Sequence, residues 1–421
     1  MFLRKSFVLS LIFFGLSTVV YPQLNEIGKF ELESRKNRKV VIPFKMINNL
    51  IVIPLSINDS DTLHFVLDTG VASTLITELS EEDIVPLNYL RTVSISGLGE
   101  GESVSVYYSP ENTIQIGKAL GTRQDVLVMI EDVFHLSGLL GTEVNGLIGY
   151  SVFKNFIVEL DYHLKRIILH DHDRYGKKYE EKKQSDKWSE IPLSLFRQKP
   201  YVDLEIEQKD GSRVDVKLLL DSGASHGMAL YYTANDHIHL PENKIRSFLG
   251  NGISGEINGY LGRINSLMVD EHELYDVVAS YPDEEGIKRA LVFSERDGSI
   301  GADVLRRFKV FINYKEESMI LRPSSGFKDN FTYNISGMEI ATPYPDVPIF
   351  SVTHVRDSSL AHKADIRRGD ILLNINRLGS QYYDLNKLNH LFQKDGQKIQ
   401  FKILRDEETI KRELILKNEL Y

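Results

Sequence analysis

The chain contains no cysteine, only one tryptophan and no long apolar run after its N-terminal segment. The missing cysteines exclude disulfide bonds, thiolate metal sites and a lipid-modified N-terminal cysteine. The formal net charge of −9 gives no support for nucleic-acid binding, which would need a basic surface stripe. We therefore expect a protein that is stabilised by core packing alone. We also predict, as a separate point, no bound metal ion and no cofactor.

Residues 1–23 have the pattern of a secretory signal peptide. Arg4 and Lys5 supply a positive start, and an apolar stretch follows over 7–20. That stretch is short for a membrane helix, and no second hydrophobic span follows it. The pattern predicts export, to a bacterial periplasm or to the medium. Anchoring by an uncleaved N-terminal segment is the alternative.

The length of 421 residues suits two or three domains, and two stretches of the chain resemble each other. In residues 50–76, an apolar strand ends in Asp68-Thr69-Gly70. In residues 200–230, a second apolar strand ends in Asp221-Ser222-Gly223. Each stretch predicts a β-hairpin whose second strand delivers an aspartate to a tight turn.

A second match follows at nearly the same distance along the chain. Residues 146–169 resemble 298–321, with Gly149 aligned on Gly301. Asp68 precedes its glycine by 81 positions and Asp221 precedes its own by 80. The matched spacing predicts an internal duplication, with lobes at about 38–170 and 190–323. The charged run 171–189 is predicted to be a solvated linker between them.

Two aspartates on equivalent turns of a duplicated lobe would meet near a pseudo-twofold axis. Like charges in contact cannot both ionise cheaply, so such a pair shares one proton. The ionised member can take a proton from water, and the protonated member can donate to a carbonyl oxygen. The pattern therefore indicates acid–base hydrolysis of an amide without a covalent intermediate.

These motifs resemble those of pepsin-like and retropepsin-like aspartic proteases. The resemblance implies a mainly β fold, with two retropepsin-like lobes related by pseudo-twofold symmetry. It also implies flap-like hairpins at the glycine-rich segments 97–101 and 250–255. Val71 and Ser299 depart from the family pattern. The implied site residues are the catalytic Asp68 and Asp221, with loop support from Thr69, Gly70, Ser222, Gly223, Gly149 and Gly301.

Residues 338–417 have a different composition and predict an α+β domain. Strands are expected at 348–355, 371–375, 397–404 and 409–416, with helices at 359–364 and 384–394. This pattern resembles a bacterial PDZ domain, although Asp365 replaces a usual glycine. The resemblance implies binding of an extended peptide at a sheet edge. By resemblance, the peptide-binding loop consists of Val347, Pro348, Ile349 and Phe350.

The sequence therefore predicts an exported aspartic endopeptidase that acts on peptide or protein substrates. One chain suffices for its active site, and a PDZ-like module binds peptides or substrate tails. The alternative is an inactive protein that binds peptides through the cleft and the module. A two-carboxylate glycoside hydrolase is disfavoured, because its acids need not lie in matched turns of a repeat. The pairs His170/His172 and His237/His239 are expected to be exposed rather than metal-binding.

Overall fold

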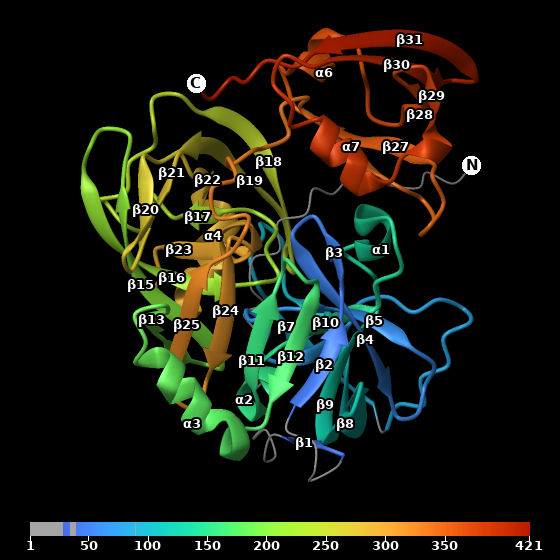
Figure 1. The fold of residues 1–421 in the computed structure, drawn as a ribbon. Helices are drawn as coiled ribbons and strands as arrows, with labels where there is room; N and C mark the ends of the chain where they lie inside the picture. The colour runs from blue at the N-terminus through green and yellow to red at the C-terminus, as the bar shows by residue number, and fades with distance from the viewer. Residues whose placement is uncertain (1–27, 34–38, 89) are drawn as a thin grey trace.

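The computed structural model describes residues 28–33, 39–88 and 90–421. The predicted signal peptide, residues 1–23, lies outside the described residues. Within the described part, no helix is both long and apolar enough to cross a membrane. Strands dominate throughout, so the prediction of a mainly β fold is confirmed (Figure 1).

The first lobe is a closed β-barrel. Strand order runs β9-β6-β10-β5-β4-β8, and β8 pairs again with β9. Alternate residues of β4 enter different apolar cores, with Ile51 and Ile53 in one and Leu50 and Val52 in the other. A strand buried on both faces needs this unbroken apolar run. The elements are β1 (Lys29–Leu32), β3 (Lys45–Ile47), β4 (Leu50–Ile57), β5 (Leu63–Leu67), β6 (Thr74–Ile76), β7 (Arg91–Ile95), β8 (Val104–Ile116), β9 (Ala119–Met129), α1 (Leu136–Leu140), β10 (Gly146–Ile148) and α2 (Tyr150–Asn155).

The second lobe repeats this strand order. Its path is β18-β19-β22-β17-β23-β16-β15, which matches β7-β8-β9-β6-β10-β5-β4 element for element, with β14 on β15 as β3 lies on β4. Helix α4 lies between β22 and β23 as α1 lies between β9 and β10, and β20 pairs with β15 as the far end of β8 pairs with β4. Among the described residues, β1 of the first lobe has no counterpart. The elements are β14 (Ser194–Phe196), β15 (Lys199–Glu207), β16 (Arg213–Asp221), β17 (Met228–Leu230), β18 (Ile245–Gly252), β19 (Gly255–Arg263), β20 (Ser266–Val269), β21 (His272–Tyr275), β22 (Val278–Pro282), α4 (Glu284–Phe293), β23 (Gly298–Gly301) and α5 (Ala302–Leu305).

A six-stranded sheet, in the order β13-β25-β24-β11-β12-β2, joins the lobes (Figure 1). Its central pair aligns Glu159 with Phe311, and these two residues occupy equivalent places in the repeat. A residue that pairs with its own equivalent lies on the symmetry axis, so the pseudo-twofold passes between these strands. The strands are β2 (Lys39–Pro43), β11 (Ile157–Asp161), β12 (Arg166–His170), β13 (Ser189–Pro192), β24 (Phe308–Asn313) and β25 (Ser318–Pro323).

The linker forms a helix, α3 (His172–Lys183), rather than a wholly solvated connector. Tyr179 on this helix is buried against Phe311 of the shared sheet. His170 is also buried, which corrects the expectation that it is exposed: its ring hydrogen-bonds Glu159 at 2.8 Å and stacks on Tyr175 at 3.8 Å. A few aromatic residues in a charged run thus suffice to fix one helix face to the sheet.

The C-terminal domain is a small sheet with two α-helices, as its sequence predicts. Its sheet order is β26-β27-β28-β30-β31, with β29 on β28. The elements are β26 (Met338–Ala341), β27 (Phe350–Val355), α6 (Leu360–Lys363), β28 (Ile371–Ile375), β29 (Leu378–Gly379), the short 3-10 turn η1 (Ser380–Tyr382), α7 (Leu385–Leu391), β30 (Lys398–Arg405) and β31 (Glu408–Ile415).

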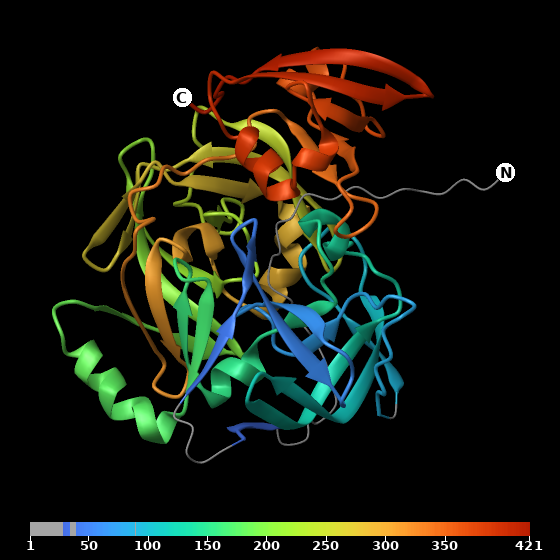
Figure 2. The ribbon, with the colours of Figure 1, turned by 45° about the vertical axis from the view of Figure 1, so that its right-hand side comes forward.

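This domain packs against the first lobe (Figure 2). The N–H of Thr342, just after β26, donates to the carbonyl of Gly138 in α1 at 2.9 Å. At the turn between β3 and β4, the N–H of Asn48 donates to Asn386 of α7 at 3.0 Å. Asn389, one turn further along α7, donates to the Asn48 side chain at 2.8 Å. The edge of β26 and the start of α7 therefore face the first lobe.

Candidate active site

The two predicted catalytic aspartates lie at equivalent positions. Asp68 follows β5, and Asp221 ends β16. Each delivering strand pairs in parallel with a strand from the downstream motif, β10 for the first and β23 for the second. Both side chains are buried, with exposed fractions of 1% for Asp68 and 0% for Asp221. The matched motifs of the repeat thus meet in space in each lobe.

Four hydrogen bonds lock the two aspartate loops together. The Thr69 hydroxyl donates to the Leu220 carbonyl at 2.6 Å and accepts from the Ser222 N–H at 2.9 Å. The Ser222 hydroxyl donates to the Leu67 carbonyl at 2.9 Å and accepts from the Thr69 N–H at 3.0 Å. Each hydroxyl therefore satisfies one buried donor and one buried acceptor of the opposite lobe, so the loops are fixed relative to each other.

Glycine is required beside the carboxyl of Asp68. A Cβ atom on Gly223 would collide with the Asp68 carboxyl group, and one on Gly149 would collide with the Asp68 carbonyl oxygen. Gly301 is crowded in the same way by the carbonyl of His226. The glycines of both motifs thus allow backbone from one segment to approach the aspartate loop that it braces.

The environment of Asp68 favours a retained proton. Burial raises the pKa of this carboxyl. Several groups lower that pKa without cancelling the rise. The Gly70 N–H donates to the Asp68 Oδ1 at 2.6 Å, and the charge of Lys199 acts in the same direction. Contacts with the Asp221 carboxyl and the Gly223 N–H also lower the pKa. Two carboxyls within hydrogen-bond reach in a buried site share one proton, because ionising both would bring like charges together.

The predicted flap-like segments are hairpin tips that touch each other. The first tip joins β7 to β8, and the second joins β18 to β19. The Ser254 N–H donates to the Leu98 carbonyl at 2.9 Å, and the Gly101 N–H donates back to Ser254. Gly99 has φ +121° and lies so close to Gly255 that a side chain would collide there. The two tips are therefore joined backbone to backbone.

Each tip also inserts an apolar side chain into the other lobe. Leu98 of the first lobe packs with Tyr231 and Leu249 of the second. Ile253 of the second lobe packs in the first-lobe core that includes Val71. Both inserted side chains are buried. Because these cores adjoin the aspartate loops, the joined tips cover the carboxyl pair.

The two departures from the family pattern are both accommodated. Val71 is buried in the core that receives Ile253. The Ser299 hydroxyl lies 3.4 Å from the ring of His226, which follows the second motif closely. Burial lowers the pKa of His226 to about 3, so its ring is neutral. Among the described residues, no group of three His, Asp or Glu side chains is arranged to hold a metal ion.

Sequence reasoning missed three polar residues beside the pair. Tyr201 pairs with Leu219, so Lys199, two residues earlier in β15, lies level with Asp221 at the end of β16. Arg296 precedes β23, and its guanidinium lies 5.5 Å from the ring centre of Tyr231. The equivalent of Lys199 is Leu50, since Val52 pairs with Val66 in the first lobe. The sequence signal that could have revealed Lys199 is its alignment with the leucine at position 50 of the other repeat. That alignment appears only when the two hairpins are compared by strand register.

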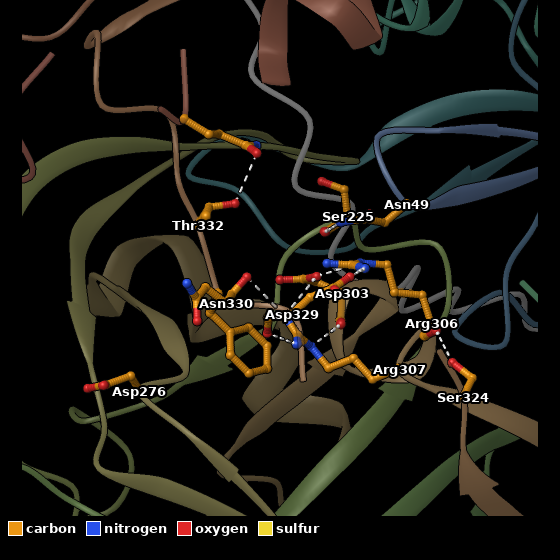
Figure 3. Close-up of polar contacts among 12 residues, drawn as sticks. Asn49, Ser225, Asp276, Asp303, Arg306, Arg307, Ser324, Asp329, Asn330 and Thr332 are labelled. Atoms are coloured by element: carbon orange, nitrogen blue, oxygen red, sulfur yellow. Dashed lines mark hydrogen bonds and ion pairs between the residues drawn. The ribbon is translucent and has the colours of Figure 1, made fainter. Parts of the chain in front are cut away.

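A separate cavity of about 1050 Å³ lies where the two lobes and the C-terminal domain meet. Asn49 donates to the Ser225 carbonyl at 3.0 Å on its wall. Asp303 pairs with Arg306 at 2.7 Å, and Arg306 in turn contacts Asp329 of the connection to the C-terminal domain at 3.0 Å (Figure 3). These contacts hold the connecting segment against the second lobe.

The predicted peptide-binding loop does not lie at an open sheet edge. Val347, Pro348, Ile349 and Phe350 lead into β27, which already has β26 and β28 on its two sides. A peptide can be added only at an edge, and in the described sheet the edge strand beside this loop is β26. The structure thus places residues 347–350 before a strand with a neighbour on each side, and their role in peptide binding stays a prediction.

Comparison with known proteins agrees with the geometry of the first lobe. Residues 53–152 match the family described as aspartyl protease. No curated protein sequence matches the chain. Among solved structures, the chain is similar to the aspartic proteinase from Irpex lacteus, with 11% identity, a TM-score of 0.43, and coverage of 70% of this chain and 99% of that one. By sequence, the segment that carries Asp68 is thus similar to aspartyl proteases.

Proposed function

We propose that the protein is an aspartic endopeptidase whose catalytic groups are Asp68 and Asp221. The observation that carries the proposal is the pair of buried carboxyls on loops locked by Thr69 and Ser222. Such a pair, holding one proton between two equivalent sites, is arranged for general acid–base attack of water on an amide. The match of residues 53–152 to aspartyl proteases supports the same assignment.

In the proposed reaction, the ionised carboxyl takes a proton from a bound water molecule while the water oxygen attacks the peptide carbonyl carbon. The other carboxyl donates its proton to the carbonyl oxygen. Collapse of the tetrahedral intermediate then breaks the C–N bond, and the amine leaves with a proton returned by the pair. The joined hairpin tips must open to admit the substrate and close to exclude bulk water.

Peptide cleavage by the purified chain tests this proposal, with Asp68→Asn and Asp221→Asn beside it. Each substitution should abolish cleavage, because neither carboxyl alone can both donate and accept. Asp210→Asn is the matched control, since Asp210 lies in an exposed turn of the second lobe. Full activity in either dyad variant would refute the assignment. A wild-type protein that binds peptides without cleaving them would favour the inactive binding protein instead.

The C-terminal domain is proposed to bind an extended peptide by strand addition along β26. Its place at the end of the sheet order supports this role. In the present arrangement α1 lies beside that strand, and Leu385 of α7 packs on Gly141. Peptide binding there would therefore compete with docking on the first lobe. Peptide titration of wild type and Gly141→Trp, which should displace the domain, tests this: tighter binding by the variant is expected, and equal affinity would refute competition.

A further inference from the structure

Two cationic side chains are buried beside the carboxyl pair, and three of their nitrogen atoms lack a hydrogen-bond partner. Lys199 is 5% exposed and Arg296 is 4% exposed. Within the described part of the chain, the Nζ of Lys199 and the Nε and Nη2 of Arg296 make no hydrogen bond. Isolated buried charges cost several kcal/mol unless they are paired, so such an arrangement points to a partner that arrives from outside.

When Lys199 is protonated, the charged groups around these side chains carry one excess positive charge. The charged groups that act on Lys199 are Arg296, which opposes its protonation, and Asp68 and Asp221, which favour it. Burial is the largest influence and lowers the pKa of Lys199 to about 7. Two carboxyls that share one proton carry a single negative charge, against two cations when Lys199 is protonated. One further carboxylate would balance the site and restore the charge of Lys199.

The cluster lies close to the joined hairpin tips. Tyr231, whose ring lies under Arg296, packs with Leu98 of the first hairpin tip. Burial raises the pKa of Tyr231 to about 12, so its hydroxyl stays protonated and can donate. Arg296 opposes that rise, although the two side chains do not meet hydrogen-bond geometry. The cluster therefore lies beneath the tips that must open for substrate.

We propose that Lys199, Arg296 and Tyr231 form a subsite that binds the carboxylate of an acidic residue next to the scissile bond. Lys199 and Arg296 supply the charge, and the Tyr231 hydroxyl supplies a neutral donor. The inference rests on the proposed peptidase function and adds to it a substrate class, peptides with Glu or Asp beside the cleaved bond. The symmetry-equivalent position is Leu50, so the first lobe has no matching charge there.

Cleavage of matched peptides tests the subsite. Bonds cut in a mixed peptide pool are first located by mass spectrometry, and pairs are then made that differ only in Glu or Gln at each position flanking the bond. Wild type should cleave one Glu peptide at least about tenfold faster in kcat/KM than its Gln partner, as expected for a charge-assisted contact. A second pair with free or amidated C-termini separates a side-chain carboxylate from a terminal one. No Glu preference at either position would overturn the proposal.

Variants assign the preference to its residues. Lys199→Met and Arg296→Met should each reduce the Glu-to-Gln ratio of kcat/KM to within about twofold. Lys199→Arg should keep much of the ratio, and Lys209→Met, at an exposed lysine of the same lobe, should keep all of it. Circular dichroism checks that each variant folds. Equal loss on both peptides with a shifted pH profile in Lys199→Met would overturn the proposal, because Lys199 would then serve the carboxyl pair.

A binding measurement keeps the two proposals separate. Fluorescence anisotropy with the same labelled Glu and Gln peptides is measured on full-length Asp68→Asn. If wild type cleaves nothing but this variant still binds the Glu peptide at least about tenfold tighter, the peptidase proposal fails and the subsite stands. Equal binding of both peptides would overturn the subsite whether or not cleavage occurs.

Discussion

Truncating Leu98 to alanine should release the joined hairpin tips without unfolding either lobe. The side chain is buried in the second lobe, where it packs with Tyr231 and Leu249. Full burial of a leucine contributes about 2 kcal/mol at 25 cal/mol per Å². The cost at a tip that can relax should stay near that value rather than at the upper end for rigid cores. A loss of about 2 kcal/mol lowers the ratio of closed to open tips by about 30-fold.

Native-state hydrogen exchange of backbone amides measures this ratio directly. The N–H of Ser254 donates to the Leu98 carbonyl at 2.9 Å, and the N–H of Gly99 donates to the Gly286 carbonyl at 2.8 Å. Both amides are protected only while the tips stay closed. In Leu98→Ala their exchange should speed up by about 30-fold, while amides of the shared six-stranded sheet change little. Ile253→Ala should have the same effect, because it removes the reciprocal insertion.

Leu267→Ala is the matched control. Leu267 is equally buried but lies in the body of the second lobe. This variant should lower global stability and leave the ratio between tip and sheet exchange unchanged. Unchanged tip protection in Leu98→Ala, together with a fall in global stability, would refute the view that this side chain holds the tips closed.

Three further changes test the loops, the shared sheet and the linker. Ser222→Ala leaves the Leu67 carbonyl and the Thr69 N–H without partners, and should cost about 3 kcal/mol in denaturant unfolding. Burial alone would raise the pKa of Glu159, but hydrogen bonds from His170 and Lys309 outweigh it and lower that pKa to about 2. The ionised Glu159 therefore stabilises the fold above its unfolded pKa of about 4.5. As pH falls toward 2, the free energy of unfolding should decrease by up to about 3 kcal/mol. This decrease should be absent in Glu159→Gln. Gly176→Ala, in α3 with open space around it, should raise stability by up to about 1 kcal/mol.

Different results would contradict each of these. A Ser222→Ala protein as stable as wild type would mean that the hydroxyl bonds do not hold the loops. If wild type and Glu159→Gln lost the same stability as pH fell, the Glu159 carboxylate would not be a cause of acid sensitivity. A less stable Gly176→Ala would mean that the glycine meets a conformational need that the helix geometry does not reveal.

Proton balance in the carboxyl pair also predicts the pH profile of cleavage. Burial raises the pKa of Asp68, so the pair keeps its shared proton above the pH at which an ordinary aspartate loses one. Activity needs that proton and is lost when it leaves. We therefore expect the alkaline limb of kcat/KM to lie above pH 4, and a limb below that value would contradict the environment described for Asp68.

The sequence predicted those features that depend on short segments. Asp68 and Asp221 are delivered by hairpins whose apolar strands and glycine turns are local patterns, and the strands and helices of the C-terminal domain follow from local periodicity. The duplication added long-range information, because equal spacing of the motifs implies equal topology. For this reason the two lobes share the same strand order as well as similar individual strands.

Features that depend on tertiary contacts were missed or mispredicted. The burial of His170 depends on Glu159 and Tyr175, which come from separate elements. Lys199 was missed, because only the register of β15 against β16 shows that it lies level with Asp221. Sequence also cannot show that β27, which follows residues 347–350, has a neighbour on each side, whereas β26 lies at the end of the sheet.

The difference between Leu50 and Lys199 gives the cleft a direction. A peptide has distinct amino and carboxyl ends, whereas two identical lobes around a twofold axis present the same surface to either polarity. Once both lobes are encoded in one gene, a substitution in one copy is not imposed on the other. A lysine opposite a leucine can then distinguish a chain bound in one orientation from the same chain reversed, so that cleavage is aligned with the sequence of the substrate.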